Sequence, residues 1–214
     1  MKKITLLLSF LFLISCHGNN VLSPKEQQLI KKLNFETELM VLLKNETAQE
    51  LVQLPAIDQE TGDVLKGFYN GICSKTKTDD NYTIVKKLKD QFRGKGYLIF
   101  TFIGEKDESY IAVIKGRDEL DIIRYRRTDG INYNLQNKNV VEQLEKWKSK
   151  NDFNILVCGR DFLQLEFKTL PTDLDAFAKE VYKFCPDIVD QGVGDIKNLK
   201  SAIKEMNGLY LWWD

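Results

Sequence analysis

The sequence predicts an α+β fold, in which helices pack on a mixed or antiparallel sheet and the C-terminal strand lies inside that sheet. Three observations predict it. Runs rich in β-branched and aromatic residues occur at 97–104, 109–116, 153–159 and 161–167. Segments with apolar residues at helical spacing separate or follow these runs. A final apolar run, LYLWWD, occupies residues 209–214.

The first part of the chain is predicted to be helix and loop. The motif SPKE at 23–26 predicts a helix start with a capping box and a proline in the first turn. Residues 35–46 fit either a helix or a strand. Residues 54–80 are loop-like, with room for one short strand, and Asp80 is expected to cap a helix that ends at Gly94. Residues 23–95 therefore form a helical and loop region that carries no familiar motif.

The second part, residues 96–214, is predicted to be the α+β domain. It begins with a hairpin, and residues 118–130 then fit a short helix or a strand. Asn139 is expected to cap the next helix, and a second hairpin follows at 153–167. The motif PTDLD at 171–175 predicts another helix start. The final helix is expected to be capped by Asp195, after a glycine-bearing loop at 187–194.

The final run alternates between the two faces of a strand. Leu209, Leu211 and Trp213 lie on one face, which is expected to enter the core. Tyr210 and Trp212 lie on the other face. The sequence thus predicts a strand that stabilises the fold through one side and is available for recognition through the other.

The N-terminus has the pattern of an export signal. Two lysines precede an apolar run at 4–14 that is too short to cross a bilayer as a helix. The run ends in Leu-Ile-Ser-Cys at 13–16, which resembles the lipobox of bacterial lipoproteins. This resemblance implies a signal peptide at 1–15, a lipidated Cys16 (diacylglycerol and palmitate) and a short tether at 16–22. The expected location is the bacterial cell envelope, with the chain held on a membrane by its lipid.

Three blocks of the second half resemble a known family. They are DGINYNLQNKNVVEQLEKW, LPTDLDAFAKEVYKFCPDIVDQGVGDIKNLKSAIKEM and LYLWWD. Together they are similar to the bacterial family called domain of unknown function 4253, over about residues 108–214. The resemblance implies a C-terminal domain and no established activity.

Composition excludes several classes of function. The chain has a formal net charge of zero, which gives no electrostatic reason to expect nucleic acid as a partner. Its one histidine, His17, lies beside the predicted lipid site, so histidine-based catalysis and zinc sites are not expected in the folded part. No catalytic residue, metal ligand or cofactor site is predicted. The spacing of the cysteines leaves a Cys73–Cys185 disulfide open, with Cys158 as a buried thiol.

Two functional hypotheses remain. The first is a non-enzymatic binding module, of inhibitor or immunity type, that recognises an unknown protein or small-molecule ligand. Its predicted surface consists of Trp212, Tyr210, Asp187, Gln191, Gly192, Asn132 and Tyr133. The second is a hydrolase or other enzyme that uses the carboxyl groups of Asp187, Asp190 and Asp214. The membrane leaflet, the oligomeric state and the role of 23–95 stay open at this stage.

Overall fold

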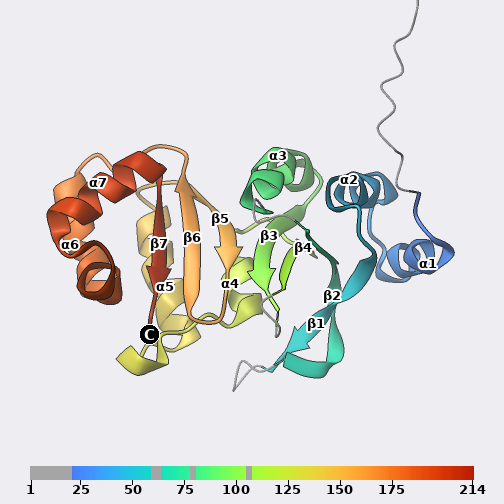
Figure 1. Cartoon of the computed structure of the whole chain (residues 1–214), viewed down its shortest axis with the longest axis horizontal. Helices are drawn as coiled ribbons and strands as arrows, with labels where there is room; N and C mark the ends of the chain where they lie inside the picture. The colour runs from blue at the N-terminus through green and yellow to red at the C-terminus, as the bar shows by residue number, and fades with distance from the viewer. Residues whose placement is uncertain (1–20, 59–63, 78–80, 105–107) are drawn as a thin grey trace, which may run out of the picture.

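The computed structural model describes residues 21–58, 64–77, 81–104 and 108–214 (Figure 1). The predicted signal peptide, Cys16 and Asp80 lie outside these residues. The elements in chain order are α1 (Pro24–Leu33), α2 (Thr37–Thr47), β1 (Leu51–Ile57), β2 (Val64–Lys75), α3 (Asn81–Gly94), β3 (Tyr97–Ile103), β4 (Ser109–Lys115), α4 (Leu120–Arg126), η1 (Ile131–Tyr133), α5 (Asn137–Lys148), β5 (Phe153–Cys158), β6 (Phe162–Phe167), α6 (Leu174–Phe184), η2 (Ile188–Val193), α7 (Ile196–Met206) and β7 (Gly208–Trp212).

The described strands form one mixed sheet in the order β1-β2-β4-β3-β5-β6-β7. Neighbouring strands are antiparallel except β3 and β5, which run parallel and are in register at Thr101 and Val157. The predicted α+β class, with the C-terminal strand in the sheet, is confirmed. Strand β7 takes an edge position and pairs with β6.

Helices cover both faces of this sheet. Helices α1, α2 and α3 pack on one face, in a cluster that includes Met40, Phe92 and Ile99. Helices α4 to α7 pack on the other, in a cluster that includes Trp147 and Phe100. Because side chains alternate along a strand, Ile99 and Phe100 enter opposite layers. The core is therefore divided into two layers by the sheet.

Residues 54–80, predicted to be mostly loop, contain most of β1 and all of β2, so that prediction was wrong. Pro55 lies where the pairing of β1 shifts register, and an edge strand tolerates proline because one row of its amides faces outward. Gly71 breaks the hydrophobic pattern of β2. A Cβ at this position would lie 2.9 Å from both Leu54 Cδ2 and the Val113 oxygen, so close strand packing requires glycine.

Most helix starts agree with the predictions, and the ambiguous segments 35–46 and 118–130 are helical, in α2 and α4. Ser23 and Glu26 form the predicted capping box of α1. The predicted cap Asn139 was wrong, since α5 begins after Gln136 and Asn139 is its third helical residue. Its side chain accepts from the Gln136 N–H, which explains why it resembled a cap.

Two segments near the C-terminus also differ from the predictions. Helix α6 begins later than PTDLD suggested, because Asp173 is the residue that caps it, by accepting from the Ala176 N–H. Residues 187–194, predicted to be a loop, contain the π-helical turn η2. Asp195 caps α7 as predicted, through the Asn198 N–H at 2.7 Å.

The three described cysteines are free thiols. Cys73, Cys158 and Cys185 are all buried, so the disulfide that spacing left open between Cys73 and Cys185 is absent from the structure. Burial raises the pKa of the Cys73 and Cys158 thiols to about 12 and that of Cys185 to about 11. Buried thiols of this kind are unreactive, as expected for Cys158.

A buried charged cluster, the Glu119 clasp, joins the parts of the chain before and after residue 96. It consists of Lys89, Arg93 and Glu119. The Glu119 carboxylate accepts from Lys89 Nζ at 3.0 Å, Arg93 at 2.6 Å and the Ile155 N–H at 2.8 Å. Lys89 Nζ also donates to the carbonyls of Ile99 and Ile155, one on β3 and one on β5. The clasp therefore holds the parallel strands together beyond their one register pair.

Candidate functional site

Strand β7 shows the predicted alternation of buried and accessible side chains. Leu209, Leu211 and Trp213 are buried, whereas Tyr210 is 37% exposed and Trp212 is half-buried. The buried side belongs to the layer of α4 to α7. One face of the strand thus stabilises the core while the other reaches the surface.

Trp213, the residue after β7, anchors the end of the described chain. Its indole N–H donates to the Phe184 carbonyl at 3.3 Å, and its ring meets that of Phe184 edge to face at 5.5 Å. Gly130 lies against the ring, and a Cβ there would approach Trp213 Cγ to 2.8 Å. The glycine in DGINYN is therefore needed for close approach to the tryptophan.

Asp187 forms the centre of this region. It lies in the link between α6 and η2, and the residue is 2% exposed. One carboxyl oxygen accepts from the Tyr133 hydroxyl and from Gln191 Nε2 at 3.0 Å, and the other accepts from the Asp214 N–H at 2.8 Å. The hydrogen bond to Asp187 raises the pKa of Tyr133 to about 12. We call this group of four residues the Asp187 knot.

The accessible side of β7 adjoins the knot. Trp212 packs against Gly192 of η2 so closely that a Cβ at Gly192 would lie 2.6 Å from Trp212 Cη2. The rings of Tyr210 and Trp212 are 5.4 Å apart, and those of Phe162 and Tyr210 are 6.1 Å apart. Phe162, Tyr210, Trp212 and Gly192 form a continuous surface, which we call the aromatic face.

Phe162 is the member of this surface that the sequence analysis missed. The alternation of a strand could have located it, because Phe162, Gln164 and Glu166 are alternate residues and lie on the same outer side of β6. The structure pairs Phe162 with Trp212 in the ladder of β6 and β7.

The outer edge of β7 is closed at its C-terminal end. The N–H of Trp213 donates to Asp161, so odd-numbered residues of this strand direct their main-chain groups to β6. Trp212 therefore directs its carbonyl outward, where the Cys185 thiol donates to it at 2.8 Å. Together with the Asp187–Asp214 contact, this covers an edge that would otherwise be open to another strand.

The three carboxyl groups of the enzyme hypothesis have different surroundings. Asp187 uses both oxygens in the knot, and Asp190 accepts from the Tyr182 hydroxyl at 2.9 Å. Asp214 is exposed and meets Asp187 through its main chain. Within the described ranges, no group of three or more His, Cys, Asp or Glu side chains is placed to hold a metal ion.

The structure brings most of the predicted surface together. Trp212, Tyr210 and Gly192 belong to the aromatic face, and Asp187, Gln191 and Tyr133 belong to the knot behind it. Asn132 is exposed beside Tyr133 in η1. Asp187 differs most from its predicted role, because its side chain is buried and fixes neighbouring segments.

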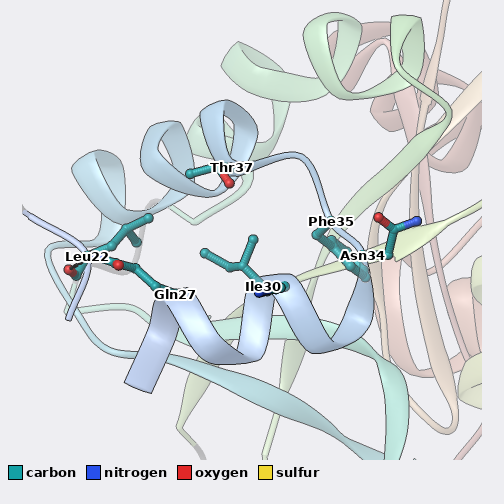
Figure 2. A pocket seen from close by; sticks show the side chains of 7 residues that line it. Leu22, Gln27, Ile30, Asn34, Phe35 and Thr37 are labelled. Carbon is teal, nitrogen blue, oxygen red and sulfur yellow. Dashed lines mark hydrogen bonds between the residues drawn. The ribbon is translucent and has the colours of Figure 1, made fainter. Parts of the chain in front are cut away.

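Three hollows on the surface lie elsewhere. Their volumes are about 470, 490 and 510 Å³, and they lie beside α1 and α2 (Figure 2), between α6 and α7, and between α5 and α6. None of the three is lined by a residue of the aromatic face. In the part of the chain that the structure describes, no helix is long and apolar enough to cross a bilayer.

Comparison with known proteins places the candidate site within one family. Residues 110–214 match the model of a domain of unknown function, DUF4253. The C-terminal half of the chain is a DUF4253 domain. This segment contains the Asp187 knot and the aromatic face. Strand β3, which lies between β4 and β5 at the centre of the sheet, precedes the matched residues. The DUF4253 segment therefore shares its sheet with the preceding residues. No curated protein and no solved structure matches the chain.

Proposed function

We propose that this chain is a lipid-anchored protein of the bacterial envelope that acts as a non-enzymatic binding module. Its partner is a protein, which it recognises through the aromatic face in the manner of an inhibitor or immunity protein. One observation carries the proposal: the buried Asp187 fixes η1, η2 and the end of β7, so that Tyr210 and Trp212 are held at the surface.

The chemistry of this surface supports a protein partner. Tyrosine and tryptophan are enriched at protein interfaces because they offer a large contact area with few rotatable bonds. The aromatic face holds both, beside Phe162 and a glycine. Its rings are seated by Gly192 and by the ladder with β6, so little side-chain freedom remains to be lost on binding.

The same geometry argues against the enzyme hypothesis. A general base or nucleophile must be able to reach a substrate. Both oxygens of Asp187 are occupied inside the protein, and the Asp190 side chain is bound by Tyr182. These contacts support a structural role for the carboxyl groups of Asp187 and Asp190.

Photocrosslinking in intact cells tests the surface. A photoreactive phenylalanine analogue at position 210 is expected to capture a protein partner, and the same analogue at position 69 is the matched control. Tyr69 and Tyr210 are both tyrosines on strands, each 37% exposed, but Tyr69 lies on β2, toward the other edge of the sheet.

Binding of the purified partner completes the test. We expect Tyr210→Ala to weaken binding by about tenfold or more, as at interface hot spots, while Tyr69→Ala leaves it within about twofold. Equal capture from both positions, or affinity that is unchanged by Tyr210→Ala, would contradict the proposed surface. The melting temperature of each variant is measured as well, so that a loss of binding through unfolding is excluded.

The lipid anchor is tested separately. Cys16→Ala is expected to abolish labelling with radioactive palmitate and to release the protein from the membrane fraction. Cys73→Ala is the matched control, because it also removes one thiol and should keep the label. Continued membrane attachment of Cys16→Ala would refute the anchor.

A further inference from the structure

The solvent-facing side of α1 differs in charge from the other described helices. Its exposed polar side chains are lysine and glutamine from the first turn to the last: Lys25, Gln27, Gln28, Lys31 and Lys32. The acidic residue of α1, Glu26, is 1% exposed and bonds inward to Lys44 at 2.8 Å. Every other α-helix has an acidic side chain that is at least partly exposed: Glu38, Asp90, Asp121, Glu142, Asp175 and Glu205.

These lysines have few anionic partners in the protein. Lys25 forms an exposed ion pair with Glu50, which water screens strongly. Among the described residues, no ion pair involves Lys31 or Lys32. The positive charge on this side of the helix is therefore available to an external anion.

A hollow of about 470 Å³ adjoins the same side (Figure 2). Leu22, Ile30 and Phe35 are its buried apolar residues. Figure 2 shows Ile30 extending from α1 into the space beside α2, where Thr37 lies. The polar lining comes from Gln27, Lys31, Asn34 and Thr37, and it contains no carboxylate. Amide, hydroxyl and ammonium donors of this kind suit a phosphate group.

The position of this surface along the chain matters as much as its charge. Leu22, which lines the hollow, is the sixth residue after Cys16. Six residues span at most about 20 Å when fully extended. A lipid on Cys16 would therefore keep the hollow and the start of α1 close to the headgroup layer.

We propose that the lysine side of α1 and the adjoining hollow bind anionic phospholipid headgroups of the membrane that carries Cys16. The inference rests on the proposed lipid anchor and extends it from attachment to orientation. Lys31 contacts the lipid phosphate at the mouth of the hollow, and Lys25 and Lys32 face the same leaflet.

Tethering makes this weak attraction effective. Each lysine near an anionic leaflet strengthens binding by about fivefold, so three lysines alone give only modest affinity. A short tether raises the effective concentration of the surface at the membrane to the millimolar range. Headgroup contact at α1 then directs the opposite end of the molecule, with α6 and α7, away from the membrane (Figure 1).

Vesicle binding of the chain from residue 17 to 214 tests the surface without the anchor. We expect stronger partition into vesicles that contain phosphatidylglycerol than into phosphatidylcholine vesicles, with a loss at high salt. The Lys31→Gln/Lys32→Gln variant should bind phosphatidylglycerol vesicles about ten- to thirtyfold less tightly. The control Lys197→Gln/Lys204→Gln removes the same charge from α7, and it should remain within about twofold of the unchanged chain.

A second measurement uses the lipidated protein in the same vesicles. Since the described cysteines are buried, Gln28→Cys can be labelled with a fluorophore, and Ser201→Cys on α7 is its control. A quencher on the lipid headgroups should quench the label at 28 more strongly than the label at 201. Equal quenching, equal partition into both vesicle types, or equal loss in the α7 control would overturn the inference. Since the partition assay lacks Cys16, its outcome is separate from that of the anchoring test.

Discussion

The two halves of the molecule each place a buried carboxyl group where three segments meet, but they give it different partners. In the first half, the Glu26 carboxylate accepts from Lys44 Nζ, from the Leu51 N–H and from the Ser23 N–H. These hydrogen bonds join α1, α2 and β1. In the second half, the neutral donors of the Asp187 knot join η1, η2 and the end of β7. The first junction contains a salt bridge to Lys44, whereas the second consists of hydrogen bonds from uncharged groups.

The Glu119 clasp spans both halves, and breaking it should have the largest effect. Glu119→Ala is expected to cost about 3–5 kcal/mol of unfolding free energy, because it leaves Lys89 buried without its anion. Denaturant titration measures this loss. Lys89→Met/Glu119→Ala should be more stable than Glu119→Ala alone. A double variant that is less stable than the single one would show that the unpaired ammonium is not the cause.

Breaking the Asp187 knot should have the next largest effect. Asp187→Ala leaves the Tyr133 hydroxyl, the Gln191 amide and the Asp214 N–H without their acceptor, so we expect a loss of about 2–4 kcal/mol. Asp190→Ala is the matched control, because that side chain is exposed and holds one hydroxyl. It should change the unfolding free energy by less than about 0.5 kcal/mol. Equal effects of the two substitutions would show that the hydrogen bonds of Asp187 do not stabilise the fold more than the exposed contact of Asp190.

Acid should weaken the Glu26 junction. Burial acts to raise the pKa of Glu26, but hydrogen bonds from Lys44, Leu51 and Ser23 prevail and lower it from 4.5 to about 2. As the pH falls, the Glu26 carboxyl group therefore takes up a proton in the unfolded chain before it does so in the folded protein. The stabilisation present above pH 4.5 is lost as the pH falls toward 2. The loss is about 2–3 kcal/mol. The loss should appear as a lower melting temperature at acid pH, and this fall should be absent from the Glu26→Gln variant.

Disturbing the contact between Gly192 and Trp212 should have the smallest effect on the free energy of unfolding. Gly192→Ala forces the Trp212 ring to move, because the new Cβ would lie 2.6 Å from it. We expect a loss of about 1–2 kcal/mol and a change in tryptophan fluorescence. Gly94→Ala, where no atom lies within 4 Å of the added Cβ, is the control. Unchanged emission in Gly192→Ala would show that the ring is not held there.

Local signals in the sequence predicted much of the fold. The capping box at 23–26 and the cap Asp195 are confirmed because a cap contacts amides two or three residues away. Strands β1 and β2 were missed because Pro55 and Gly71 interrupt the hydrophobic pattern. The reasons for both residues are tertiary: an edge position for Pro55 and close packing by neighbouring strands for Gly71.

The site was predicted in outline, and its organisation was not. The alternation in LYLWWD located Tyr210 and Trp212 correctly on the outer side of β7. The role of Asp187 could not be predicted, because its partners Tyr133 and Asp214 are distant in the chain. Pairing over such distances leaves no period or spacing that one sequence would reveal. The binding of a partner stays a prediction.

The place of β3 has a consequence for how the sheet assembles. Strands β3 and β4 are close in the chain and form a hairpin, whereas β3 meets β5 only after α4 and α5 have been spanned. Closing so long a loop costs chain entropy before any contact forms. We therefore expect the boundary between β3 and β5 to close late in folding. This boundary lies one strand away from β4, in which the family match begins, so the last pairing to form joins β3 to a strand of the DUF4253 segment.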